Sequence, residues 1–134
     1  GEIGLLPYLD HTIEYYASGN LFRAFFNTTA EEAHQQAQLG NPEAVRYWDE
    51  FGVHLAEALK CVVLAYDPEA IVLGGSVSKA YDFFKDSMRN ALQIFPFPES
   101  VRRLKIFRSE NENIVLLGAA EMVTAYIRSL VKAS

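Results

Sequence analysis

The chain of 134 residues has a single cysteine, Cys61, and that scarcity excludes two kinds of structure. No disulfide can form within the chain, and a zinc site built mainly from its thiolates is excluded. Cys61 lies in the apolar run LKCVVL, where a free cysteine behaves as a small hydrophobic residue. No histidine stands near it in a pattern that would activate a nucleophile, so we expect a packing role.

Long apolar runs are also missing. No segment approaches the ~20 apolar residues that a membrane helix needs, and the first residues lack the basic and apolar regions of a signal peptide. We therefore expect no membrane partner, and the cytoplasm is the default location. The chain starts on an apolar segment without methionine, from which we expect further sequence upstream.

Cations are few and mostly scattered. Twelve Lys and Arg residues against seventeen Asp and Glu residues give a net charge of −5, so duplex nucleic acid is not an expected partner. The densest group of cations is Arg102, Arg103, Lys105 and Arg108. We interpret it as a solvated face, with a phosphate-binding patch as the alternative.

The sequence does contain enough apolar material for one folded domain. Half of its residues are hydrophobic and 22% are charged, which is not the composition of a disordered chain. A chain of this length buries about two-thirds of its unfolded surface on folding. No repeat or Pro/Gly/Ser linker divides it, so we expect a single domain over residues 1–134.

The clearest predicted element is a long helix that begins after Asn41 and ends before Asp67. Asn41 is a good N-cap, and Pro42 suits the first helical position. Apolar residues then recur every three or four positions. Pro68 disfavours helical geometry in the residue before it.

A buried strand is predicted directly after that helix. Residues 70–73 (AIVL) form a short apolar run of the kind found in parallel sheets covered on both faces. A Gly-Gly turn follows, then a second helix over residues 77–92, a break at residues 95–98 and a possible strand at residues 104–108. The order indicates an α/β fold, with helices packed on a small sheet.

The two ends of the chain are predicted to be helical. Residues 12–26 indicate a helix or a helix pair interrupted at residues 18–20, and Thr29 with Glu32 fits a capping box. Gly40 suits the end of the helix that Thr29 begins. A last helix is expected over residues 115–130, capped by Asn111 or Asn113.

The turn formed by Gly74, Gly75 and Ser76 is the first candidate site. Ligands of open α/β sheets lie outside the carboxyl ends of the strands, and glycine allows a ligand to approach the backbone closely. The pattern matches neither a P-loop nor a GxGxxG fingerprint. A plain tight turn therefore remains the alternative to a nucleotide site.

Two carboxylates near the start, Glu2 and Glu14, are the second candidate, because paired carboxylates accept hydrogen bonds from neighbouring sugar hydroxyls. Their spacing alone does not place them in one site, so two unrelated surface acids remain possible. The three histidines, His11, His34 and His54, show no metal-ligand spacing. An aromatic group near residues 15–26 is expected to pack in a core or interface: Tyr15, Tyr16, Phe22, Phe25 and Phe26.

Three stretches in this order make the sequence resemble the ROK family of bacterial sugar kinases and sugar-responsive repressors. They are residues 1–4 (GEIG), residues 13–19 (IEYYASG) and residues 67–78 (DPEAIVLGGSVS), and residues 117–120 (LGAA) resemble the opening of the family's final helix. The resemblance implies the C-terminal domain of an actin-like (ribonuclease H-like) ATPase fold, as the C-terminal lobe of a longer protein.

The resemblance also implies roles for the candidate residues. Glu2 and Glu14 match family positions that contact sugar hydroxyls, and Gly74, Gly75 and Ser76 match the adenosine-binding segment. The family's catalytic base and phosphate-binding segments belong upstream of Gly1, so no catalytic residue is assigned and the isolated chain is expected to be inactive. ATP with Mg²⁺ and a hexose are the implied ligands, and a homodimer or higher homo-oligomer is the implied assembly.

The sequence departs from the family at its zinc cluster. Leu5 stands where the family usually has histidine, and the stretch before Glu14 has no cysteine. We therefore predict no structural zinc, with apolar packing in its place. Three hypotheses remain: an ATP-dependent, glucokinase-like hexose kinase, the ligand-sensing domain of a ROK-type repressor, and a folding and dimerisation module. The absence of a zinc cluster favours the kinase over the repressor.

Overall fold

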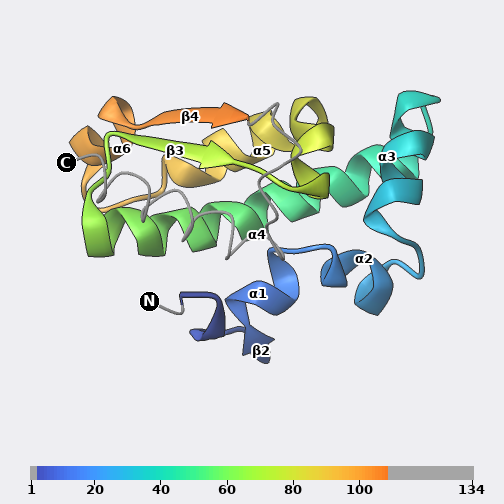
Figure 1. Ribbon diagram of the computed structural model, residues 1–134, viewed down its shortest axis with the longest axis horizontal. Coiled ribbons are helices and arrows are strands. Elements are labelled where there is room, and N and C mark those ends of the chain that lie inside the picture. Colours follow the sequence, from blue (N-terminus) through green and yellow to red (C-terminus); the bar gives the residue numbers. More distant parts are fainter. Residues whose placement is uncertain (1–2, 109–134) are drawn as a thin grey trace.

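The computed structural model describes residues 3–108, which form a helix-rich α/β structure (Figure 1). Its N-terminal third consists of short elements. The later part combines one long helix with two strands and two further helices. In chain order the elements are η1 (Ile3–Leu5), β1 (Pro7–Tyr8), β2 (His11–Thr12), α1 (Ile13–Tyr16), α2 (Asn20–Phe25), α3 (Ala30–Gln38), α4 (Pro42–Tyr66), β3 (Ala70–Leu73), η2 (Ser76–Ala80), α5 (Tyr81–Leu92), α6 (Pro98–Arg103) and β4 (Lys105–Arg108).

Helix α4 begins and ends where the sequence predicted. The Asn41 side chain accepts hydrogen bonds from the amides of Glu43 (3.0 Å) and Ala44 (3.4 Å), and Pro42 is the first helical residue. The last helical residue is Tyr66, and the C-cap Asp67 adopts a left-handed conformation with φ of 44°. These 25 residues connect the N-terminal elements to the sheet.

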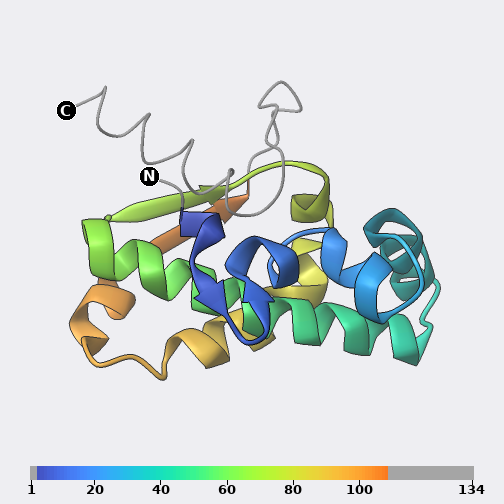
Figure 2. The ribbon, with the colours of Figure 1, turned by 90° about the horizontal axis from the view of Figure 1, so that it is seen from below.

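The two predicted strands are confirmed, and they pair in parallel as β3 and β4. Ala70 lies opposite Lys105, and Leu73 lies opposite Arg108. Figures 1 and 2 show the two strands side by side over the pair of helices α4 and α5. Ile71 and Leu73 are buried, whereas Ala70 and Val72 are only partly buried, so the two faces of β3 are not equally covered.

The helix predicted over residues 77–92 is confirmed only in its second part. The chain first forms the 3-10 helix η2, and the regular helix α5 begins at Tyr81. The cause is local, because both the amide and the hydroxyl of Ser78 donate hydrogen bonds to the Gly75 carbonyl, at 3.2 Å and 2.6 Å. These i to i+3 bonds give the tighter turn of a 3-10 helix.

The N-terminal elements follow the predicted helix pair. Helices α1 and α2 are separated at residues 17–19, and a short antiparallel hairpin, β1–β2, precedes them. Thr29 caps α3 by accepting from the Glu32 amide (3.1 Å), and Gly40 follows the helix with φ of +84°. The expected last helix, its caps Asn111 and Asn113, and residues 117–120 lie outside the described residues.

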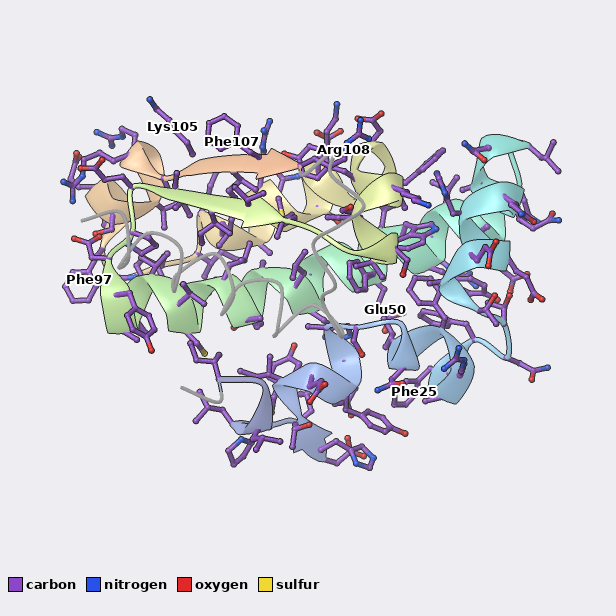
Figure 3. The ribbon with its side chains drawn as sticks, viewed as in Figure 1. Phe25, Glu50, Phe97, Lys105, Phe107 and Arg108 are labelled. Carbon is purple, nitrogen blue, oxygen red and sulfur yellow. The ribbon has the colours of Figure 1, made fainter. Side chains whose placement is uncertain are left out.

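The core is centred on aromatic rings carried by α2, α4 and α5. Trp48 lies 4.5 Å from Phe22, 5.3 Å from Phe51 and 5.9 Å from Phe84 between ring centroids, and all four side chains are fully buried. Of the predicted aromatic group, Tyr16 and Phe22 are buried, whereas Phe25 is 51% exposed (Figure 3). Within residues 3–108, none of the helices is both long and apolar enough to cross a membrane.

Candidate functional site

The glycine turn stands at the carboxyl end of β3. Gly74 is buried and Gly75 is partly buried, while Ser76 is exposed. Gly75 has φ of 76° and ψ of −178°, a conformation that only glycine adopts without strain. The bond from the Ser78 hydroxyl to the Gly75 carbonyl holds the turn in this shape. Gly74 and Gly75 therefore present backbone without side chains, beside the exposed Ser76, at the edge where ligands of α/β sheets bind.

The parallel register brings a cation to the same edge. Arg108 is the last residue of β4 and lies opposite Leu73, which directly precedes Gly74. Figure 3 shows Arg108 at the end of its strand. Its guanidinium is suited to phosphate or carboxylate groups. Sequence inspection left Arg108 within a general cationic group, because register between strands is not visible in a sequence.

The other cations of that group have different surroundings. Arg102 forms an exposed ion pair with Glu99 (2.6 Å), and Arg103 lies 3.7 Å from Asp67. Exposed ion pairs of this kind contribute ~0–1 kcal/mol to stability. The expected solvated face thus describes Arg102 and Arg103, and it leaves Lys105 and Arg108 to be considered separately.

The second candidate, Glu14, lies on α1 and is partly buried. Its helix starts immediately after the β1–β2 hairpin, so the hairpin sets the position of the carboxylate. The neighbouring Tyr15 ring stacks on His11 at 3.9 Å between centroids. Glu2 lies outside the described residues, so the pairing of Glu2 with Glu14 stays a prediction.

The hairpin is attached to α4 by a hydrogen bond that sequence inspection missed. The Tyr8 hydroxyl lies 2.9 Å from His54 Nδ1, although the two residues are 46 positions apart. His54 Nε2 lies 3.6 Å from a carboxylate oxygen of Glu50, and the Tyr16 hydroxyl donates to Asp10. The hairpin is therefore bonded to α4 through Tyr8 and to α1 through Asp10.

This cluster occupies the stretch where the family's zinc cluster was predicted to be replaced by apolar packing. The contacts are instead aromatic and hydrogen-bonded: Tyr8 and Tyr16 meet edge to face at 5.3 Å, and Tyr16 lies 5.0 Å from the His54 ring. In residues 3–108, no group of three or more His, Cys, Asp or Glu side chains is arranged to hold a metal ion. Cys61 is partly buried, and burial raises the pKa of its thiol, which fits the predicted packing role.

Burial lowers the pKa of His54 below the usual 6.5, and the carboxylates of Glu50 and Glu57 oppose that shift. Burial also lowers the pKa of His34, assisted by the charge of Lys79. Both folded-state pKa values thus lie below those of the unfolded chain. The unfolded chain binds more protons in this range, so the stability present above about pH 6.5 is lost as the pH falls below it.

We expect the free energy of unfolding to fall between about pH 7 and about pH 5. His54→Gln should reduce that fall, because the neutral amide keeps a hydrogen-bonding side chain but does not titrate. Urea unfolding at both pH values measures the effect, and His34→Gln should reduce it independently. An unchanged pH dependence in the double variant would contradict the assignment.

Comparison with solved structures shows the fold. The chain aligns with a protein from Cytophaga hutchinsonii provisionally named a sugar kinase (TM-score 0.70, 18% identity, 95% of this chain and 48% of that one). It also aligns with a ROK family transcriptional regulator homologous to the E. coli MLC protein (TM-score 0.69, 21% identity, 92% of this chain and 35% of that one). A third match is a ROK hexokinase from Thermus thermophilus (TM-score 0.61, 23% identity, 96% of this chain and 49% of that one).

These neighbours confirm the predicted α/β class and the actin-like ATPase fold. The chain spans between about a third and a half of the length of each neighbour. Comparison with curated protein sequences gives no match. The sequence matches the model of the ROK family over residues 10–125, which is most of its length. This match confirms the resemblance inferred from the motifs, and the chain belongs to the ROK family.

Proposed function

We propose that the chain is the C-terminal lobe of an ATP-dependent hexose kinase of the glucokinase type, which acts in the cytoplasm as a homodimer or higher homo-oligomer. The observation that carries the proposal is the glycine turn at the carboxyl end of β3, where the Ser78 hydroxyl donates a hydrogen bond to the Gly75 carbonyl. A sugar sensor needs a sugar site alone, whereas a kinase also needs a nucleotide site. Two adjacent glycines at this edge are suited to a nucleotide site, because they let a ligand approach the backbone closely.

Each part of the site would have a separate role. The Gly74–Gly75 backbone would admit the adenosine, with Ser76 beside it. Glu14, and Glu2 with it, would accept hydrogen bonds from hexose hydroxyls, since a carboxylate has lone pairs for several such donors. The Tyr8–His54 and Tyr16–Asp10 hydrogen bonds would hold α1 and thereby orient Glu14.

The chemistry of phosphoryl transfer needs groups that the described residues do not supply. A base must orient the sugar hydroxyl, and donors with Mg²⁺ must surround the transferred phosphate. In this proposal the other lobe provides them, and closure of the two lobes excludes water from the reacting groups. No zinc takes part.

The test is sugar-dependent release of ADP from Mg-ATP by the full-length protein, with glucose and related hexoses. Glu14→Gln should raise the KM for the sugar about 10-fold or more, because a hydrogen bond to a charged group is worth about 1.5–3 kcal/mol. The KM for ATP should not change. Gly75→Ala should instead raise the KM for ATP and leave the KM for the sugar unchanged, since alanine does not fit the conformation of residue 75.

The matched control is Glu31→Gln, which removes an exposed acid from α3 and should change neither KM. Activity that survives Glu14→Gln unchanged would contradict the sugar role. The similarity to a ROK regulator keeps one other candidate, a sugar-sensing repressor domain. That candidate predicts hexose binding without ATP binding, and titration of each ligand separates the two.

A further inference from the structure

A pocket lies between the C-terminal end of α5, helix α6 and strand β4. Its volume is about 710 Å³, which is within the range of small-molecule binding sites. Apolar residues from all three elements and the link between α6 and β4 line it: Leu92, Val101, Leu104 and Ile106. Its lining shares no residue with the glycine turn or with α1, so the proposed function gives it no role.

The lining also includes cationic residues. Arg89, Arg102 and Lys105 also line the pocket. The segment of residues 89–108 carries five cationic side chains and one acid, whereas the whole chain has a net charge of −5. The positive charge is therefore concentrated on this part of the molecule, where it attracts anions.

Much of that charge is not neutralised locally. Arg102 pairs with Glu99, and Arg89 donates to the Tyr81 hydroxyl (3.0 Å), which is uncharged. No acid within residues 3–108 lies within ion-pairing distance of Arg89 or Lys105. An anion in the pocket would thus gain charge-assisted hydrogen bonds without breaking an existing ion pair of these two residues.

One exposed aromatic residue also belongs to the lining. Phe107 is 51% exposed and lies on β4 two residues after Lys105 (Figure 3). An exposed ring of this kind offers a flat apolar surface for stacking a second ring. The pocket therefore combines a hydrophobic surface, an aromatic contact and positive charge at its border.

We propose that this pocket binds a small aromatic anion, with its ring against the apolar lining and Phe107 and its anionic group toward Arg89 and Lys105. A second copy of the chain is a poorer occupant of this face, because it would bring the same cations against each other, and like-charge contacts disfavour association. The concave shape, lined by three elements, also favours a compact ligand.

The probe is 2-naphthoate, titrated into the 134-residue chain and followed by calorimetry and by NMR shifts. We expect its Kd to lie below about 1 mM. The neutral isostere 2-naphthamide should bind about 10-fold more weakly, since it lacks the charge. Raising the salt from about 50 mM to about 500 mM should weaken naphthoate binding, because the cations are exposed and screened.

Variants locate the site. Arg89→Gln combined with Lys105→Gln should weaken naphthoate binding about 10-fold and leave naphthamide binding unchanged. Both residues are exposed, so the fold should be retained, as circular dichroism can verify. The matched control is Lys85→Gln, which removes a cation near the start of α5 that lies 3.6 Å from Asp82 and does not line the pocket. The Lys85→Gln variant should bind naphthoate as tightly as the unsubstituted chain does.

Three results would overturn the proposal. The first is equal affinity for naphthoate and naphthamide, and the second is unchanged naphthoate binding by the Arg89/Lys105 variant. The third is absence of naphthoate binding together with self-association that the same variant abolishes in sedimentation. That third result would assign the face to a second copy of the chain instead.

Discussion

Gly52→Ala is expected to lower the free energy of unfolding by about 3 kcal/mol. Gly52 lies in the middle of α4, where alanine would ordinarily be favoured over glycine by about 1 kcal/mol. Here a Cβ atom would lie 2.6 Å from the carbonyl oxygen of Phe84 and 3.0 Å from the amide nitrogen of Met88. Both are backbone atoms of α5, so the two helices would have to move apart.

Two further variants separate this clash from other effects. Val53→Ala changes the next residue of α4, which is 42% exposed, and should change stability by less than about 0.5 kcal/mol. The added Cβ would also contact the Ser87 hydroxyl. Adding Ser87→Ala to Gly52→Ala removes that contact but leaves the two backbone contacts, so it should restore little stability. Urea unfolding measures all three, and full rescue by Ser87→Ala would contradict the backbone explanation.

Trp48→Ala is expected to lower the free energy of unfolding by about 4 kcal/mol, the usual loss for removing a fully buried large aromatic ring. The indole contacts aromatic rings from three helices and fills the centre of the core. Its Nε1 is buried and has no hydrogen-bond partner within the described part of the chain. An unpaired buried donor is unfavourable by about 1–3 kcal/mol.

Trp48→Phe should lower the free energy of unfolding much less, by about 1.5 kcal/mol, because it keeps an aromatic ring and removes the unpaired N–H group. Urea unfolding followed by circular dichroism compares the two variants without relying on tryptophan fluorescence. Equal losses for alanine and phenylalanine would show that the indole nitrogen is not a liability and that ring shape alone determines the cost.

Local signals predicted the boundaries of the main elements. The Asn41 cap, the proline after it and the apolar run before Gly74 each act within a few residues, so their effect is visible in the sequence. The boundary between η2 and α5 was missed because it depends on which hydrogen bonds Ser78 makes. A serine near a helix start has several such local options, and the hydrophobic pattern of the sequence does not show which one it adopts.

The candidate sites divide in the same way. The glycine turn was predicted from a strand followed by two glycines, and it does follow the carboxyl end of β3, whereas its role as a nucleotide site stays a prediction. Arg108 was not singled out, because its place beside the turn depends on the register of β4 against β3. The Tyr8–His54 bond was missed because nothing in either segment marks the other as a partner across 46 residues.

The scarcity of cysteine and of long apolar runs, the α/β class and the family motifs were determined by the sequence itself. These features depend on composition and on short-range order, which a sequence states directly. Only the tertiary structure decided that the stretch before Glu14 is held by tyrosine, histidine and aspartate side chains, and that cations border an apolar pocket at α5, α6 and β4. Both depend on contacts between distant segments, which form only when α4, α5 and the strands pack together.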